Sequence, residues 1–244
     1  MDLPDIFHNA TTTQSKLKAR EWNDFLTRNK FDFSLIEKID FATPTPTVSD
    51  KKGNKFCIDF INDKKNYHKK KLSIKNELLS KALGGGKHGL SVLDLSAGLG
   101  IDAVFLAQLG YQVTAIERNP LIYLCLQTAS EQMLELNVKF VHDEAIRFLQ
   151  HNTSSALQKF DVIYFDPMFP EKSKSALPRQ EMVFFKQMVG ADGDATTVVE
   201  AALKVPNIKR VVVKRPLKAP PLGQKPSGSL KGKLVRFDVY GAEK

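Results

Sequence analysis

Residues 91–119 constrain the fold of this chain more than any other stretch. They read SVLDLSAGLGIDAVFLAQLGYQVTAIERN: a short apolar run, a glycine turn, a helix-like segment, and a second apolar run ending at Glu117. Two parallel strands joined by a helix form a crevice at their carboxyl ends. Glycines such as Gly98 and Gly100 let the backbone approach a ligand there, and a strand-end acid can bind ribose hydroxyls. The stretch therefore predicts half of a site for an adenosine-bearing cofactor.

The glycine spacing leaves the type of cofactor open. Gly98, Gly100 and Ala103 satisfy the spacing of a dinucleotide fingerprint, so this pattern does not exclude a dinucleotide. Asp94, followed by the small residues Ser96 and Ala97, is more typical of a methyltransferase, because an acid before the glycines can hold an amino-acid ammonium group. A plain strand–turn–helix without a ligand is the remaining alternative, so the rest of the chain has to decide.

Downstream segments continue the alternation of strand and helix. Residues 138–141 and 160–165 predict a third and a fourth strand, each after a helical segment, and residues 234–240 predict a last strand. This pattern is typical of a doubly wound, mostly parallel α/β sheet, with the last strand antiparallel at its edge. In such a sheet the first and fourth strands are neighbours at the switch point, so Asp166, which follows the fourth strand, is expected to lie beside Gly98.

The sequence Asp166-Pro167-Met168-Phe169 suits the methylation of an amino group on a base. Such a nitrogen is a poor nucleophile because its lone pair is delocalised into the ring. The Asp166 carboxylate and the Pro167 carbonyl can accept its two hydrogens and align the lone pair, while Phe169 stacks on the base. The gain comes from positioning, and the base has to be unpaired or flipped to enter the site.

The positive charge of the chain is concentrated in two segments. Residues 51–75 carry a net charge of +7 and residues 204–236 carry +10, which leaves −8 for the rest of a chain whose total is +9. This distribution favours a polyanion as partner, most simply nucleic acid, although lysines that only solvate loops would give the same count. The side chains expected to meet RNA are Tyr67, Lys69, Lys70, Lys172, Lys174, Lys214 and Arg215.

Length and composition limit the organisation of the chain. With 244 residues, 42% of them hydrophobic, it can hold one large domain and a small appendage. We expect an α+β appendage at residues 1–63 and the cofactor-binding domain at residues 64–244. The chain has only two cysteines and lacks an apolar run of membrane-spanning length or a signal-like start. We expect a cytoplasmic monomer without a metal site.

Together, the motifs resemble those of the ribosomal RNA small subunit methyltransferase J family. They are DLSAGLGIDA from Asp94, ERNP from Glu117, DPMFP from Asp166, KSAL from Lys174 and VVVKRP from Val211. The resemblance implies a Rossmann-like class I methyltransferase that moves a methyl group from S-adenosylmethionine (SAM) to N2 of a guanosine in 16S rRNA, with that RNA or the small ribosomal subunit as its partner. With the acid and glycines of the turn included, it implies cofactor contacts at Asp94, Gly98, Gly100, Ile101, Asp102, Glu117, Arg118, Glu144, Ala145 and Asp166.

The chain departs from the family pattern at two places. Ile101 stands where the family usually has an arginine, and Glu144 and Ala145 stand where small serines are frequent. Two other functions remain open from the sequence. One is an amino methyltransferase that acts on DNA or protein, and the other is a non-catalytic RNA-binding assembly factor with the same fold.

Overall fold

The structure is a computed structural model that describes residues 3–62, 77–85, 89–152, 154–168, 184, 187–188 and 193–241. The chain divides into two compact units. The first unit contains Met1–Lys64, Asn119–Leu134 and Pro170–Ala191, and the second contains Lys65–Arg118, Glu135–Phe169 and Asp192–Lys244. The boundary expected after residue 63 lies next to the end of the first of these segments. The expected cofactor-binding domain, residues 64–244, includes residues 119–134 and 170–191, which this division assigns to the first unit.

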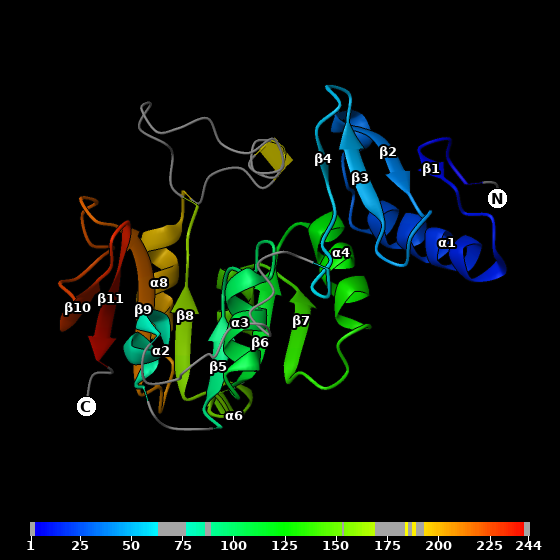
Figure 1. Ribbon diagram of the computed structural model, residues 1–244. Coiled ribbons are helices and arrows are strands. Elements are labelled where there is room, and N and C mark those ends of the chain that lie inside the picture. Colours follow the sequence, from blue (N-terminus) through cyan, green and yellow to red (C-terminus); the bar gives the residue numbers. More distant parts are fainter. Residues whose placement is uncertain are drawn as a thin grey trace. The chain divides into compact units, whose positions relative to one another are not determined.

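The second unit is built on a seven-stranded sheet. Its strands are β5 (Ser91–Asp94), β6 (Gln112–Glu117), β7 (Val138–His142), β8 (Val162–Phe165), β9 (Arg210–Pro216), β10 (Gly228–Lys231) and β11 (Val235–Gly241). Their order is β10-β11-β9-β8-β5-β6-β7 (Figure 1). The strands β5 to β9 are parallel, and β11 is antiparallel to both β9 and β10. The predicted parallel-dominated α/β sheet is confirmed.

The edge of this sheet differs from the expectation. The last strand was expected at the edge, but β10 pairs with β11 on its outer side, with Gly228 opposite Val239 and Lys231 opposite Arg236. Residues 228–231 are not among the strands predicted from the sequence. The composition did not predict this strand because its stability comes from the pairing with β11.

The strands β5 and β8 lie in the middle of the sheet and are buried. All four residues of β8 are buried, as are three of the four in β5, which is typical of parallel strands covered on both faces. The helices of this unit are α2 (Leu78–Leu83), α3 (Ile101–Gln108), α5 (Ala145–His151), α6 (Ser154–Leu157) and α8 (Ala195–Leu203). Side chains of α5, α6 and α8 form one apolar core with Leu93, Ile163 and Val211 of the sheet.

The first unit contains a small four-stranded sheet in the order β1-β2-β3-β4. Its elements are β1 (Phe7–His8), β2 (Ile36–Asp40), β3 (Thr47–Asp50), β4 (Lys55–Phe56), α1 (Thr13–Arg28), the short 3₁₀ helix η1 (Phe33–Leu35) and α4 (Pro120–Ser130). Thr12 and Ser15 form a capping box at the start of α1, and Asn119 caps α4 ahead of Pro120. In the core of this unit, Trp22 packs edge-on against Phe41 at 5.3 Å between ring centroids.

Candidate functional site

The glycine turn after β5 is tied to the acid at the end of β6. Gly98 and Gly100 have φ angles of 55° and 75°, in the left-handed region where a side chain is strained. The amide of Gly98 donates a hydrogen bond to Oε2 of Glu117, with an N···O distance of 2.9 Å. The turn and the strand-end acid expected to hold the adenosine are therefore in direct contact.

Asp94, the last residue of β5, is a buried carboxylate. Its side chain is 1% exposed, and Oδ1 accepts hydrogen bonds from the amide of Ser96 at 2.9 Å and from its hydroxyl at 3.3 Å. Burial raises the pKa of Asp94 to about 7, and the negative charges of Asp102 and Asp166 contribute to the rise, although the Ser96 amide opposes it. The ionised form of Asp94 is therefore costly unless a positive charge lies beside it.

Asp166 lies at the same edge of the sheet, because β8 pairs in parallel with β5. The amide of Asp166 donates to the Ser96 hydroxyl oxygen at 2.7 Å, so the residues after the two strands are joined through one side chain. Lys214, from β9, places its ammonium group 2.8 Å from Asp166 Oδ2 and 3.0 Å from Asp102 Oδ2. The hydroxyl of Tyr164 also donates to Asp102 Oδ2, at 2.6 Å.

These contacts define an acidic cluster that consists of Asp94, Asp102, Glu117 and Asp166. Lys214 forms ion pairs with two of its members. Burial lowers the pKa of Lys214, but the carboxylates of Asp102 and Asp166 outweigh that effect and raise it, so the lysine remains charged. Because four carboxylates gather at this edge of the sheet, the cluster is suited to a ligand that carries positive charge.

The other expected cofactor contacts follow strand ends β5, β6 and β7. Ile101 and Asp102 form the first turn of α3, and Arg118 follows β6, where its carbonyl oxygen lies 3.1 Å from Nε2 of His142. Glu144 is exposed and caps α5 without a side-chain hydrogen bond, and Ala145 begins that helix. The topology thus brings all of these positions to one sheet edge.

The expected substrate contacts are only partly described. Phe169, Tyr67, Lys69, Lys70, Lys172 and Lys174 lie outside the described residues. Lys214 is engaged by the two aspartates, and Arg215 is 3% exposed, with its Nε donating to the Pro220 carbonyl at 3.0 Å. Arg215 therefore presents no surface to RNA in this structure. The sequence placed it at the correct edge but could not show which face of β9 its side chain takes.

Comparisons with known proteins agree on one family. A family profile described as SAM-dependent methyltransferase matches residues 25–242. The ribosomal RNA small subunit methyltransferase J of Bdellovibrio bacteriovorus is 44% identical over 196 residues, which cover 79% of this chain and 77% of that protein. The enzyme of the same name from Saccharophagus degradans is 41% identical over 88% of this chain and 83% of its own length. The chain belongs to the ribosomal RNA small subunit methyltransferase J family.

A solved structure supports the fold of this methyltransferase. The crystal structure of a SAM-dependent methyltransferase from Neisseria gonorrhoeae superposes with a TM-score of 0.65 at 25% identity, covering 98% of this chain and 96% of that one. Among the described residues of the methyltransferase, no helix has the length and apolar character needed to cross a membrane. In the same part of the chain, no group of three or more His, Cys, Asp or Glu side chains is arranged to hold a metal ion.

SAM is the cofactor of this methyltransferase. The donor set fits it, because SAM carries an ammonium and a sulfonium group and the acidic cluster offers buried and half-buried carboxylates. A positive partner beside Asp94 favours its ionised form, which burial otherwise disfavours.

The sequence did not predict the contacts of two side chains in the site of this methyltransferase. Ser96 joins Asp94 to the Asp166 amide, and the Tyr164 hydroxyl contacts Asp102. A usable signal was present, because Tyr164 stands two residues before Asp166 and Ser96 two residues after Asp94, at or just beyond the strand ends.

Proposed function

We propose that the chain transfers the methyl group of SAM to the exocyclic N2 of a guanosine in 16S rRNA. The relatives named above carry the name of a small-subunit rRNA methyltransferase, which supports the substrate class. The structural observation that carries the proposal is the joining of Asp94 and Asp166 through Ser96 at the carboxyl ends of adjacent strands. We also propose that the protein acts in the cytoplasm as a monomer, on the 16S rRNA itself or on the small ribosomal subunit.

The cofactor half of the site is assigned by the chemistry of its residues. Asp94 pairs with the ammonium group of SAM, and Glu117 accepts hydrogen bonds from the ribose hydroxyls while it keeps the glycine turn in place. The backbone at Gly98 and Gly100 allows close approach of the ligand. The remaining contacts are assigned to Ile101, Asp102, Arg118, Glu144 and Ala145. Ile101 contributes apolar or backbone contact only, since its side chain has no polar atom.

In the substrate half, Asp166 and Pro167 orient the amino group. The Asp166 carboxylate and the Pro167 carbonyl each accept one hydrogen of N2, which turns the nitrogen lone pair toward the methyl donor. Lys214 holds the Asp166 carboxylate through its ion pair at 2.8 Å. When bound, SAM would supply an electrophilic methyl group to N2, with its sulfur leaving as the neutral thioether. The methylated nitrogen then releases a proton, and we assign Asp166 as its acceptor. Phe169 is assigned the stacking contact with the base.

Replacing Asp166 with alanine tests this function. We expect Asp166→Ala to lose methyl transfer to small-subunit rRNA by 100-fold or more, in the range of about 10²–10⁴ that a positioned acid–base group contributes. RNA affinity should stay within about twofold. The measurement is incorporation of labelled methyl from SAM into rRNA, with SAM affinity determined in parallel by calorimetry.

Asp194→Ala is the matched control, because Asp194 lies at the start of α8 and its side chain makes no capping hydrogen bond. DNA and bulk protein serve as alternative methyl acceptors for the wild-type protein. Wild-type rates of rRNA methylation by Asp166→Ala would contradict the assigned role. Label in DNA or protein but not in rRNA would favour another amino methyltransferase, and SAM binding without transfer to any acceptor would favour an assembly factor.

A further inference from the structure

The turn of the β10–β11 hairpin lies at the carboxyl ends of the parallel strands, where the acidic cluster also lies. Val235, the first residue of β11, pairs with Pro216, the last residue of β9. Because β9 runs parallel to β8 and β5, its carboxyl end lies at the edge where Asp94 ends β5 and Asp166 follows β8. The hairpin turn at residues 232–234 therefore lies at this edge as well.

Three lysines gather at this end of the hairpin, and we call them the lysine edge: Lys218, Lys231 and Lys233. Lys218 follows β9, Lys231 ends β10, and Lys233 lies in the turn, and all three are exposed. None forms an ion pair with another residue of the described chain. Residues 204–236 contain no Asp or Glu, and the acid that follows them, Asp238, is buried and paired with Arg236.

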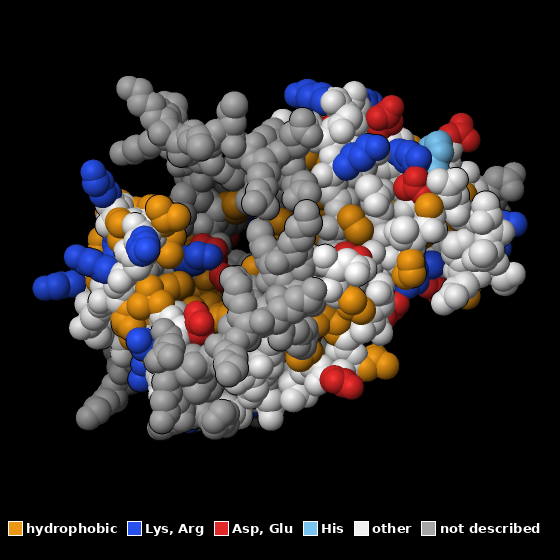
Figure 2. All heavy atoms as spheres, viewed as in Figure 1, with side chains coloured by type: hydrophobic (Ala, Val, Ile, Leu, Met, Phe, Trp, Pro, Cys, Tyr) orange, Lys and Arg blue, Asp and Glu red, His pale blue; other side chains and the backbone are white. Residues whose placement is uncertain are grey.

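Apolar side chains are exposed between these lysines. Leu234, next to Lys233, is 85% exposed, and Leu217, next to Lys218, is 38% exposed. Figure 2 shows Lys and Arg side chains projecting beside hydrophobic ones at the end of the sheet formed by β9, β10 and β11. A surface that combines ammonium groups with apolar side chains complements nucleic acid, because the ammonium groups meet phosphates and the apolar side chains can contact base or sugar surfaces.

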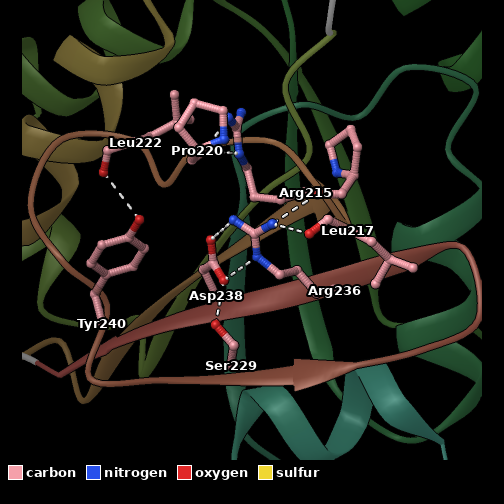
Figure 3. Close-up of polar contacts among 9 residues, drawn as sticks. Arg215, Leu217, Pro220, Leu222, Ser229, Arg236, Asp238 and Tyr240 are labelled. Carbon is pink, nitrogen blue, oxygen red and sulfur yellow. Dashed lines mark hydrogen bonds and ion pairs between the residues drawn. The ribbon is translucent and has the colours of Figure 1, made fainter.

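Buried side chains hold the backbone that carries the lysine edge. Arg236 is 7% exposed, and its Nη1 donates to the carbonyls of Pro216 at 2.9 Å and Leu217 at 2.7 Å (Figure 3). Its Nε and Nη2 pair with Asp238 at 2.8 and 2.9 Å, and Ser229 of β10 donates to the same carboxylate.

Two further side chains fix the loop after β9. Arg215 donates to the carbonyl of Pro220 and Tyr240 to that of Leu222, the latter at 3.0 Å (Figure 3). Side chains of β9 and β11 thus bind four carbonyl groups of residues 216–222. A loop ordered in advance loses less conformational entropy when its lysines bind a partner.

We propose that Lys218, Lys231 and Lys233 bind the phosphate backbone of the substrate RNA beside the target nucleotide. This inference rests on the proposed function. It assigns RNA binding to these three lysines instead of Lys214 and Arg215, because Lys214 pairs with two aspartates and Arg215 donates to the Pro220 carbonyl. Lysines on an exposed edge strand also oppose pairing between copies of a protein. That role predicts a change in self-association, with RNA affinity unaltered.

The test compares two triple variants that remove the same charge. Lys218→Gln/Lys231→Gln/Lys233→Gln removes the lysine edge. Lys139→Gln/Lys159→Gln/Lys204→Gln removes three exposed lysines elsewhere in the second unit: one on β7, one before β8 and one after α8. The Kd for a small-subunit rRNA transcript is measured by fluorescence anisotropy across a series of salt concentrations. The Kd for SAM, kcat, the KM for RNA and the sedimentation coefficient are measured on the same samples.

We expect the lysine-edge variant to raise the RNA Kd and KM at least tenfold at low salt, with kcat at saturating RNA and the SAM Kd within about twofold of wild type. The slope of log affinity against log salt should become less steep by about two. Each of the three lost phosphate contacts contributes about 0.7 to this slope for single-stranded RNA. The control variant should keep most of the affinity. An unchanged RNA Kd and slope, an equal loss in the control, or new self-association with unchanged RNA affinity would each overturn the inference. Failure of the wild-type protein to methylate rRNA would instead contradict the proposed function, which is read from the methyl label rather than from the Kd.

Discussion

At the scale of single residues, the stability of the folded protein favours protonated Asp94, whereas binding of the SAM ammonium group needs the ionised form. The burial of Asp94 makes the charged form costly, and the nearby Asp102 and Asp166 add to that cost, so its pKa rises to about 7. A folded-state pKa above the ordinary value of 3.8 means that protonated Asp94 favours the folded protein. This contribution is complete below the ordinary value and is lost as the pH rises through about 7. A site that needs Asp94 ionised for its ligand therefore costs stability when the ligand is absent.

Replacing Asp94 with asparagine separates these two effects. At pH 8, Asp94→Asn should raise the free energy of unfolding of the ligand-free protein above that of wild type, and the difference should vanish below about pH 4, where both side chains are neutral. SAM affinity should fall about tenfold or more, as expected for a charged hydrogen bond worth about 1.5–3 kcal/mol. Denaturant titrations and calorimetry at several pH values measure both quantities.

The pH dependence of SAM binding gives the control for this prediction. Wild-type affinity should weaken as the pH falls below about 7, whereas the affinity of Asp94→Asn should be nearly flat with pH. If the variant retained the pH dependence of wild type, a group other than Asp94 would be responsible for it.

At the scale of elements, the β10–β11 hairpin is stabilised by a buried ion pair. Arg236 and Asp238 are 7% and 0% exposed. Burial raises the pKa of Asp238, but hydrogen bonds from Arg236 and Ser229 outweigh it and lower the pKa below its ordinary value. A lowered pKa gives stability that is present above the ordinary value and is lost as the pH falls through the folded-state pKa. The hairpin should therefore loosen in acid rather than in base.

Removing one partner of this pair should cost more than removing both. We expect Asp238→Ala to lower the free energy of unfolding by about 3–5 kcal/mol, because the Arg236 charge is left buried without its partner. The double variant Arg236→Met/Asp238→Leu should recover part of the loss, since the packing is kept and no charge remains buried. Urea unfolding measures both, with Asp194→Ala as a control outside the pair. A double variant no more stable than Asp238→Ala would show that the hydrogen bonds to the loop carbonyls, rather than the buried charge, dominate.

At the scale of the whole molecule, the two units are interleaved along the chain. The first unit takes residues 119–134 from between β6 and β7, and residues 170–191 from between β8 and α8 of the second. The chain therefore passes repeatedly from one unit to the other, and neither consists of a single continuous segment. Such connectivity favours unfolding in one cooperative step.

Trp22 offers a direct measurement of this cooperativity. It is the only tryptophan of the sequence and is buried in the first unit, whereas the candidate SAM site lies entirely in the second. SAM at 100 times its Kd should stabilise the folded protein by about 2.7 kcal/mol. In one cooperative transition, Trp22 fluorescence and far-UV circular dichroism should show the same increase in urea midpoint. A midpoint from Trp22 that SAM does not move would show that the units unfold separately.

Local sequence determined the elements of the second unit and the positions of its strand-end residues. Glycines with positive φ, apolar runs four to six residues long and capping residues act within a few positions of one another, so residues 91–119 specified strand, turn, helix and strand without the rest of the chain. The order of elements also predicted that β5 and β8 are neighbours, because chain connections in such sheets follow few paths. Asp94 and Asp166 could therefore be assigned to one edge in advance.

Only the tertiary structure decided what each side chain meets there. Lys214 and Arg215 are adjacent in the sequence and lie on opposite faces of β9, so one joins the aspartates and the other holds the loop at Pro220. Both were expected to bind RNA, and the exposed Lys218, Lys231 and Lys233 were not singled out. The pairing of β10 with β11 and the return of 119–134 to the first unit depend on contacts between distant segments. The sequence gives the charge of each residue and the spacing of apolar positions. The burial of a side chain and the groups that it contacts depend on the whole fold.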